Sequence, residues 1–288
     1  MDTQNRCLLV RWNQLGKHLG KHDVSILSVN AHSIKKPGRF AEFLSYLDTS
    51  GVNFAFIVVV ETWLKCELSP LFEIDGYLSK SLCRSNKTGG GIKLFYRNEI
   101  SGEVIDEFSG VLDSCESLVF RAHIPIFGKI IVCCIYRPPD QSANEFCNFA
   151  SRLLDSCGNS RTLVVGDFNL NILKYNESSQ VKSYVDLFTS FGHSNGIDCP
   201  TYISCSDLSD KSCVDHCWHN LKHRTNNFAV GPPLIDHYAI VTGFECKVTQ
   251  PQIKHIFRPF SAYNVVNTRT AGVDYIPSQA AGIKNEPT

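Results

Sequence analysis

The chain has 288 residues, of which 43% are hydrophobic and 19% charged, with 18 Phe and 10 Tyr. This composition is that of a packed globular protein and excludes an intrinsically disordered chain. Lysine plus arginine equals aspartate plus glutamate at 28 each, which argues against a strongly basic nucleic-acid coat but leaves room for a local basic groove.

The first 23 residues are interpreted as an N-terminal extension, because charges and amides interrupt every short apolar run. They lack the apolar core of a secretory signal, and the longest apolar run, 54–60, is far shorter than the roughly 20 residues that span a bilayer. We therefore expect an intracellular protein that is neither secreted nor membrane-bound. The thirteen cysteines, an odd number, are expected to be reduced thiols without a disulfide framework.

From residue 24 onward, strand-like and helix-like runs alternate. The first helix is expected from the spacing of Phe40, Phe43, Leu44 and Leu47, and Gly51 can end it. The middle of the chain is expected to be antiparallel, with short connections. The strands expected in this half are 24–29, 54–60, a run starting at 92, 103–108, 117–124 and 129–136.

The second half continues the alternation. Ser142 and Glu145 form a capping box that predicts a helix ending near Gly158. A later helix has its apolar face between Val181 and Phe188. Strands are expected at 163–167, 214–219 and 237–244, and the periodicity is lost from about 247. The expected organisation is an extension at 1–23, a domain at 24–246 and a linker-like or disordered tail at 247–288.

Several apolar strands end on polar residues. VSILSVN ends on Asn30, FIVVVE on Glu61, and LVVGDFN on Asp167 and Asn169. Because polar groups at strand ends reach a shared crevice without being buried unsatisfied, these residues favour an active site. Further polar residues in or beside later strands are Asp215, Asp236 and His237.

This set of residues suits metal-assisted hydrolysis of a phosphodiester, which needs a hard cation with oxygen ligands, a polarised water and donors for phosphoryl oxygens. Glu61 is the best candidate ligand for Mg²⁺. Asp167 is expected to orient or deprotonate the water, and Asn30 and Asn169 to donate amide hydrogens to phosphate oxygens.

A histidine late in the chain completes the expected site. His237 binds phosphate if a carboxylate such as Asp215 fixes the orientation and tautomer of its ring. Taken singly, Asp167 and Asn169 fit a turn and His237 fits a structural histidine. Their occurrence in order with the other polar strand ends favours the site.

Other features leave alternatives open. The cysteines and histidines between 199 and 219 suggest structural zinc, but paired C-x-x-C spacings are missing. The glycines at 89–91 lack a following Lys-Ser or Lys-Thr, which favours a hairpin over a nucleotide loop. Candidate contacts to a DNA backbone, which fit a solvated surface nearly as well, are Lys35, Lys36, Arg39, Arg84 and Lys87.

The order of these motifs resembles the endonuclease/exonuclease/phosphatase superfamily, with its deoxyribonuclease-I-like fold, over about residues 24–245. Within it, the chain looks like the apurinic-type endonuclease domain of non-LTR (LINE-like) retrotransposons. The resemblance implies a four-layer α/β sandwich, with two packed mixed β-sheets flanked by helices. The motifs that carry it are ETWL at 61–64, GGGI at 89–92, YRPP at 136–139, GDFN at 166–169 and DH at 236–237.

The resemblance also implies roles and partners. The cofactor is Mg²⁺, with Mn²⁺ as the alternative. The substrate is DNA, nicked to leave a 3′ hydroxyl that primes reverse transcription. A nuclear location, a reverse transcriptase domain in the full-length element and a monomer are expected. The implied metal ligands are Glu61, Asn30 and Asp236. The implied contacts with phosphate or DNA are Asn30, Asn169, Tyr136, Thr201 and His237. The implied catalytic residues are Asp167, Asn169, His237, Asp215 and Tyr136.

The chain departs from the pattern at Ile235, where such proteins usually have a serine. The residues AHSI after Asn30 match only fairly, and no reverse transcriptase follows. Tyr136 also fits a half-buried strand aromatic. Two alternatives therefore stand beside the endonuclease: a phosphatase or phosphodiesterase acting on a small substrate, and a catalytically inactive remnant of a retroelement.

Overall fold

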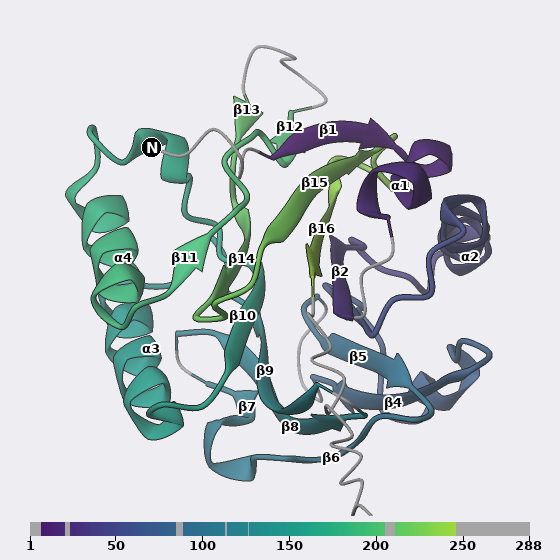
Figure 1. Cartoon of the computed structure of the whole chain (residues 1–288), viewed down its shortest axis with the longest axis horizontal. Coiled ribbons are helices and arrows are strands. Elements are labelled where there is room, and N and C mark those ends of the chain that lie inside the picture. Colours follow the sequence, from purple (N-terminus) through teal and green to yellow (C-terminus); the bar gives the residue numbers. More distant parts are fainter. Residues whose placement is uncertain are drawn as a thin grey trace, which may run out of the picture. The chain divides into compact units, whose positions relative to one another are not determined.

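The computed structural model of the chain describes residues 7–20, 24–84, 89–112, 114–125, 127–204 and 211–245. The strands of these residues form two large mixed sheets (Figure 1). The first sheet has the order β1 (Leu8–Arg11), β15 (Thr225–Gly231), β16 (Ala239–Phe244), β2 (Val24–Asn30), β3 (Phe56–Val60), β5 (Ile92–Arg97) and β4 (Tyr77–Leu82).

The second sheet lies against the first. Its order is β11 (Ser194–Asn195), β14 (Asp215–His219), β10 (Thr162–Asp167), β9 (Gly128–Tyr136), β8 (Glu116–Ile124) and β6 (Ser101–Val104), and β7 (Gly110–Val111) also pairs with β8. A separate two-stranded ladder joins β12 (Tyr202–Ile203) and β13 (Lys211–Ser212).

Helices cover the outer face of each sheet, as Figure 1 shows. Helices α1 (Trp12–Leu19) and α2 (Arg39–Ser50) pack on the first sheet, and α3 (Ala143–Cys157) and α4 (Ser179–Ser190) pack on the second. The expected four-layer α/β sandwich is therefore confirmed. Short 3₁₀ turns lie at Ser69–Leu71, Asp106–Phe108 and Ile172–Lys174.

Strand β3 shows why the central strands are continuous apolar runs. Phe56, Val58 and Val60 point into the core between the two sheets. Ile57 and Val59 point into the core under α1 and α2. Because side chains alternate with a period of two, a strand covered on both faces needs an apolar residue at every position.

Two crossovers place polar strand ends at one edge of the sheets. Strand β2 runs through α2 to its parallel neighbour β3, and β9 runs through α3 to its parallel neighbour β10. Parallel strands end at the same edge of a sheet, so residues that follow β2 and β3 come together, as do those that follow β9 and β10.

Most of the expected elements are present. Ser142 caps α3 by accepting a hydrogen bond from the amide of Glu145 at 3.3 Å, and the left-handed Gly51 follows the end of α2. The strand expected at 103–108 is wrong in its second half. There the chain leaves β6 and forms a 3₁₀ turn that brings Phe108 into the core beneath α3.

The segment before residue 24 contains a strand and a helix that the sequence analysis did not predict. Strand β1 pairs in parallel with β15. In α1 the buried residues are Trp12, Leu15 and Leu19, and the ring of Trp12 stacks on Tyr46 of α2 at 5.3 Å. Strands β4 and β15 were also not predicted. The domain boundaries themselves stay a prediction, and the tail at 247–288 lies outside the described residues.

No helix among the described residues is long and apolar enough to cross a membrane.

Candidate active site

Side chains from both sheets meet where their strands end. In the first sheet, Asn30 lies opposite Val60, the residue before Glu61. In the second sheet, Asp167 lies opposite Tyr136 on one side and opposite Asp215 on the other. Strand pairing within each sheet and packing of the two sheets thus assemble residues that are up to 185 positions apart in the chain, counted from Asn30 to Asp215.

The amide of Asn30 joins the two sheets. Its Nδ2 donates to Oε1 of Glu61 at 3.1 Å and to Oδ2 of Asp167 at 2.9 Å. Its Oδ1 accepts the backbone amide of His32 at 3.0 Å. Asn30 is 2% exposed, so these bonds are shielded from water. The amide of Asn30 thus orients the two carboxylates of the site, and its contacts with phosphate and metal stay predictions.

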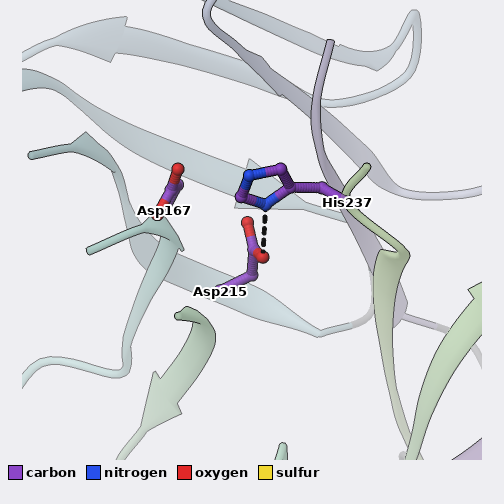
Figure 2. A group of neighbouring side chains, drawn as sticks. All are labelled: Asp167, Asp215 and His237. Carbon is purple, nitrogen blue, oxygen red and sulfur yellow. Dashed lines mark hydrogen bonds and ion pairs between the residues drawn. The ribbon is translucent and has the colours of Figure 1, made fainter. Parts of the chain in front are cut away.

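A second group of charges lies beside this link. Nδ1 of His237 is 2.9 Å from Oδ2 of Asp215, and one ligand atom each of Asp167, Asp215 and His237 lie within 4.8 Å of one another. Figure 2 shows the dashed contact to Asp215, with the second ring nitrogen of His237 on the side of Asp167. Asp215 thus lies where it can fix the orientation of the ring, and the phosphate contact of His237 stays a prediction.

Burial and neighbouring charges set the protonation states of this group. Burial first, and then the negative charge of Asp215, raise the pKa of Asp167 to about 7, against smaller lowering effects of His237 and Asn30. Burial alone lowers the pKa of His237, but Asp215, Asp167 and Asp236 outweigh it and raise the pKa to about 10. A buried imidazolium therefore stands beside a carboxyl group that titrates near neutrality.

The three charged groups have the residue types and mutual distances of a metal site, and the same types serve proton transfer and phosphate binding. A histidine must be neutral to bind a metal, and the raised pKa of His237 keeps its ring protonated at neutral pH. Its Nδ1 contacts Asp215, which leaves Nε2 to face a metal ion or a phosphate oxygen. Acid–base chemistry by these three residues stays a prediction.

Two other carboxylates fit a hard cation. Glu61 is partly exposed, and its carboxylate accepts hydrogen bonds from Asn30, from Nε1 of Trp63 at 3.0 Å and from the hydroxyl of Tyr136. A carboxylate has about four acceptor sites, so it keeps capacity for a cation. Oδ1 of Asp236 is buried without a hydrogen-bond partner among the described residues. Buried polar atoms in proteins normally have a partner, and a bound cation would be one for this oxygen.

Backbone strain is concentrated at the same place. The residues other than glycine with left-handed φ angles among those described are His32 (39°), Ser33 (81°), Glu61 (52°), Trp63 (55°) and Asn169 (48°). All of them follow strands that end at the site. Such conformations cost free energy and persist only where surrounding contacts enforce them, and they cluster at functional sites.

The GDFN loop is held by its own hydrogen bonds. The backbone amide of Asn169 donates to Oδ1 of Asp167 at 2.9 Å. The side-chain amide of Asn169 donates to the carbonyl of Arg137 at 2.8 Å and to Oδ2 of Asp167 at 3.3 Å. In this arrangement Asn169 fixes the carboxylate of Asp167, and a contact of Asn169 with phosphate stays a prediction.

Arg137, the second residue of YRPP, was not predicted as part of the site. It is 3% exposed, and its guanidinium donates to the carbonyls of Phe168 at 2.6 Å and Asn169 at 2.7 Å. A third donor contacts the carbonyl of Gln141. An arginine that follows the buried run IIVCCIY was the sequence signal, because a buried guanidinium needs several acceptors.

Tyr136 lies in the site and is 6% exposed. Burial raises the pKa of its phenol well above the usual range, and the charge of Glu61 together with a hydrogen bond to it raises the pKa further. The hydroxyl therefore stays protonated at any pH at which the protein works. Its one O–H is engaged by the carboxylate of Glu61 in this structure, and its contact with phosphate stays a prediction.

Thr201 is fully buried, at 0% exposure. Its Oγ1 accepts the backbone amides of Val214 and Asp215, both at 3.1 Å, and its carbonyl accepts the amide of Tyr238 at 2.7 Å. These bonds attach Thr201 to the backbone of Asp215 and to Tyr238, the residue after His237. The structure thus places Thr201 among residues that orient the site, and its predicted phosphate contact stays untested.

The glycines at 89–91 brace the loop that carries Glu61. The carbonyls of Gly90 and Gly91 accept the amides of Trp63 at 2.8 Å and Thr62 at 3.2 Å. The amide of Gly91 in turn donates to Oε2 of the buried Glu116 at 2.6 Å. A Cβ atom on Gly90 would lie 2.1 Å from Oε1 of Glu116, so no larger residue fits without a shift of that side chain.

Glu116 was missed by the sequence analysis, although a glutamate that opens the apolar strand β8 was a visible signal. Its Oε1 is paired with Nε of Arg84, which gives Arg84 a partner inside the protein. Arg39 donates to the carbonyl of Ala31 at 3.2 Å. The amine of Lys36 lies 5.6 Å from the ring centroid of Trp63. Lys87 lies outside the described residues.

The zinc alternative gains no support from the described residues. The only group of three or more ligand residues gathered within them is the one around Asp167. His216 is buried with its Nδ1 against the hydroxyl of Tyr184 at 2.8 Å and its Nε2 against the carbonyl of Cys213 at 3.1 Å. Cys205 lies outside the described residues.

No protein-family model matches the chain, and no curated protein matches its sequence. Solved structures match its fold. The endonuclease domain of TRAS1, a telomere-specific non-LTR retrotransposon, has a TM-score of 0.59 at 13% identity, covering 77% of this chain and 98% of that one. The 3′ phosphatase NExo from Neisseria, bound to a product DNA hairpin, has 0.57 at 14%, covering 77% and 100%. An endonuclease/exonuclease/phosphatase family protein from Leptotrichia buccalis has 0.56 at 12%, covering 77% and 100%.

These similarities show the fold. The chain has the deoxyribonuclease-I-like sandwich of endonuclease/exonuclease/phosphatase proteins, as the order of its motifs indicated. Because sequence identity is low, the chemistry has to be argued from the site itself.

Proposed function

We propose that this protein is a divalent-metal-dependent DNA endonuclease of retrotransposon type. The observation that carries the proposal is the junction at the sheet edge, where Asn30 links the carboxylates of Glu61 and Asp167 beside the pair of Asp215 and His237. In the proposal, Asp167 activates the water, the imidazolium of His237 binds the phosphate and Glu61 binds the metal ion. The order of ETWL, YRPP and GDFN and the likeness to the TRAS1 endonuclease domain support this choice within the fold.

Glu61 and Asp236 are the residues that would hold the metal ion, for which we propose Mg²⁺, with Mn²⁺ as a substitute. A cation bound there supplies Lewis-acid stabilisation of charge on the phosphoryl oxygens. Titration calorimetry with Mg²⁺ in the absence of DNA tests this step directly. Glu61→Gln is expected to weaken binding about tenfold or more, whereas equal binding by the variant would contradict the assignment.

Asp167 accepts the proton of the attacking water. Its pKa of about 7 lies near the working pH, which is where a general base is most effective. Hydrogen bonds from Asn30 and Asn169 hold the carboxylate in one orientation. The base is thus positioned before the substrate arrives.

His237 acts as a cationic donor to the phosphate. Asp215 engages Nδ1, so Nε2–H is the group that can donate to a phosphoryl oxygen as negative charge develops there. The phenol of Tyr136 supplies a further neutral donor to the scissile phosphate. Both side chains are almost fully buried, and a low local dielectric strengthens their interaction with charge.

We further propose that the cut leaves a 3′ hydroxyl, which in a retroelement primes reverse transcription of the element at the target site. The proposal includes DNA as the substrate, a nuclear site of action, a monomeric domain and a reverse transcriptase domain as the functional partner. These points rest on the motif resemblance.

Nicking of supercoiled plasmid tests the function. The wild type is expected to nick in Mg²⁺ but not in EDTA, and DNA polymerase is expected to extend the nick from its 3′ hydroxyl. Asp167→Ala should lower the rate by about 10²–10⁴-fold, because the general base is lost. Asp106→Ala, which removes an exposed carboxylate of the 3₁₀ turn after β6 that has no role in the proposed site, should nick like the wild type.

A folded wild type that fails to nick in either Mg²⁺ or Mn²⁺ would contradict the endonuclease and leave the inactive remnant. Ile235→Ser separates a disabled copy from a different enzyme. Oδ1 of the neighbouring Asp236 is buried without a partner among the described residues, and a serine hydroxyl could donate to it. Nicking that appears only in Ile235→Ser would identify a recently disabled nuclease.

The phosphatase alternative is favoured by the fold likeness to a 3′ phosphatase, because base, cation and metal ligand serve either reaction. Release of inorganic phosphate from an oligonucleotide with a 3′ phosphate measures it. Phosphate release without plasmid nicking would replace the endonuclease by this activity.

A further inference from the structure

Two cysteines far apart in sequence come together at the edge of the first sheet. Sγ of Cys7 lies 2.6 Å from Sγ of Cys199, across a sequence separation of 192 residues. Unbonded carbon atoms pack at about 3.5–4.0 Å, and sulfur is the larger atom. The two sulfurs are therefore well inside packing distance, and a disulfide bond would bring them to about 2.05 Å.

A hydrogen bond also joins the two segments that carry the pair. The amide of Cys7 donates to Oδ1 of Asp198 at 2.9 Å, so the segments on either side of the sulfurs are already joined. Cys7 and Cys199 are both only partly buried. The pair is therefore less shielded from solvent than buried thiols such as Cys133 and Cys134.

The pair has an internal division of roles. The hydrogen bond between the thiols lowers the pKa of Cys199 and, with burial, raises the pKa of Cys7. The thiolate is the reactive form in thiol–disulfide exchange. In the order that these directions favour, Cys199 attacks and Cys7 resolves the intermediate, and the reverse order gives the same disulfide.

We propose that Cys7 and Cys199 are an oxidation site at which a small disulfide, such as glutathione disulfide, introduces one reversible disulfide bond. The thiolate of Cys199 attacks one sulfur of glutathione disulfide and releases a glutathione thiolate. Cys7 then loses its proton, attacks the sulfur of Cys199 and releases the second glutathione. Two protein thiols are oxidised, and one glutathione disulfide is reduced to two glutathione molecules.

The bond would fasten an edge strand that is weakly held. Strand β1 has four residues and pairs with β15, and its Leu8 and Leu9 are 52% and 64% exposed. Short edge strands are held by few contacts. A covalent tie at Cys7 would restrict β1 in the unfolded chain as well as the folded one.

The tie would also restrain the segment behind the active site. Cys199 is two residues before Thr201, whose Oγ1 accepts the amide of Asp215. In the same segment, Ile203 donates its amide to the carbonyl of Asp236 at 3.2 Å, and Tyr202 forms a bridge with His237. Oxidation is therefore expected to reduce hydrogen exchange at the amides of Asp215 and Ile203.

The test uses the full chain, reduced, desalted and then incubated with glutathione disulfide. Non-reducing peptide mapping by mass spectrometry is expected to show a peptide linked through Cys7 and Cys199. Titration in denaturant should show the loss of two of the thirteen thiols. The Tm is expected to rise by about 5 °C or more, and dithiothreitol should reverse all three changes.

Cys7→Ser and Cys199→Ser should each abolish the linked peptide and the Tm shift, whereas Cys66→Ser, which removes an exposed cysteine, should keep both. Circular dichroism of each reduced variant verifies that it is folded. The proposal is overturned if the folded wild type gives no peptide linked through Cys7 and Cys199, or if that peptide forms only after unfolding in urea. A linked peptide of Cys66 and Cys83 formed in its place would also overturn it. None of these readouts depends on DNA cleavage.

Discussion

His237 carries its charge because carboxylates surround it where water is excluded. Burial opposes the imidazolium, yet the three aspartates near it raise its pKa to about 10. The same burial, together with Asp215, raises the pKa of Asp167 to about 7. Between these two values Asp167 is ionised while His237 is protonated, which is the combination that the proposed hydrolysis needs.

The rate of nicking is therefore expected to follow a bell-shaped pH profile. It should rise as Asp167 loses its proton near pH 7, because the base must be ionised, and fall as His237 loses its proton near pH 10. The apparent values belong to the coupled pair. Measurement of kcat/KM for plasmid nicking across this range checks it, and a rate that does not change between pH 6 and pH 8 would contradict the role of Asp167.

Asp215→Asn separates the effect of Asp215 from that of simple burial. Without the charge of Asp215, burial should dominate, and the alkaline limb of the profile should move to lower pH by about 1–3 units. NMR titration of the His237 ring measures the same shift without DNA. Asp106→Asn, a change in an exposed carboxylate, should leave the ring pKa as it is, and an unchanged ring pKa in Asp215→Asn would refute the assignment.

At the scale of elements, close strand pairing places the site residues and restricts what can stand between them. Gly166 precedes Asp167 and lies opposite Ile135 of β9. A Cβ atom at Gly166 would lie 1.9 Å from the carbonyl oxygen of Ile135, and its φ angle is +143°. The glycine of GDFN is thus required by the backbone of its neighbouring strand.

Gly166→Ala is expected to lower the free energy of unfolding by about 3 kcal/mol or more, since overpacking and backbone strain add. Gly76→Ala is the matched control. Gly76 has φ +84° and open space around its Cβ position, so it should lose only about 1–2 kcal/mol from strain. Urea denaturation measures both variants, and equal losses would show that the contact with Ile135 relaxes easily.

At the scale of the whole molecule, the first described segment completes the outer helical layer. Trp12 is 3% exposed, stacks on Tyr46 and donates its indole N–H to the carbonyl of Pro232 at 3.1 Å. Its contacts connect α1 with α2 and with the chain between β15 and β16. Residues 8–19 thus contribute to the same core as the later strands.

Trp12→Ala is therefore expected to lower the free energy of unfolding by about 3–5 kcal/mol, because it empties a large buried site. Leu9→Ala removes an apolar residue that is 64% exposed and should change stability by less than about 0.5 kcal/mol. The urea midpoint measures both. A Trp12→Ala variant that unfolds at the wild-type midpoint would mean that α1 contributes little to the fold.

The sequence predicted the central strands because burial on both faces demands a continuous apolar run, as in FIVVV before Glu61. It predicted α3 because the capping of Ser142 is a local interaction. It did not predict β1, β4 or α1. The edge strands β1 and β4 have exposed and polar residues, and their pairing depends on neighbours far away in the chain.

By itself the sequence determined which side chains end the apolar strands: Asn30, Glu61, Asp167 and Asn169. Only the tertiary structure showed that Asn30 joins both sheets through bonds to Glu61 and Asp167, and that Glu116 braces the glycines behind Glu61. The physical reason is the sequence separation over which each interaction acts. A strand's apolar pattern is local and can be read along the chain, whereas a hydrogen bond across 137 residues depends on how the two sheets pack.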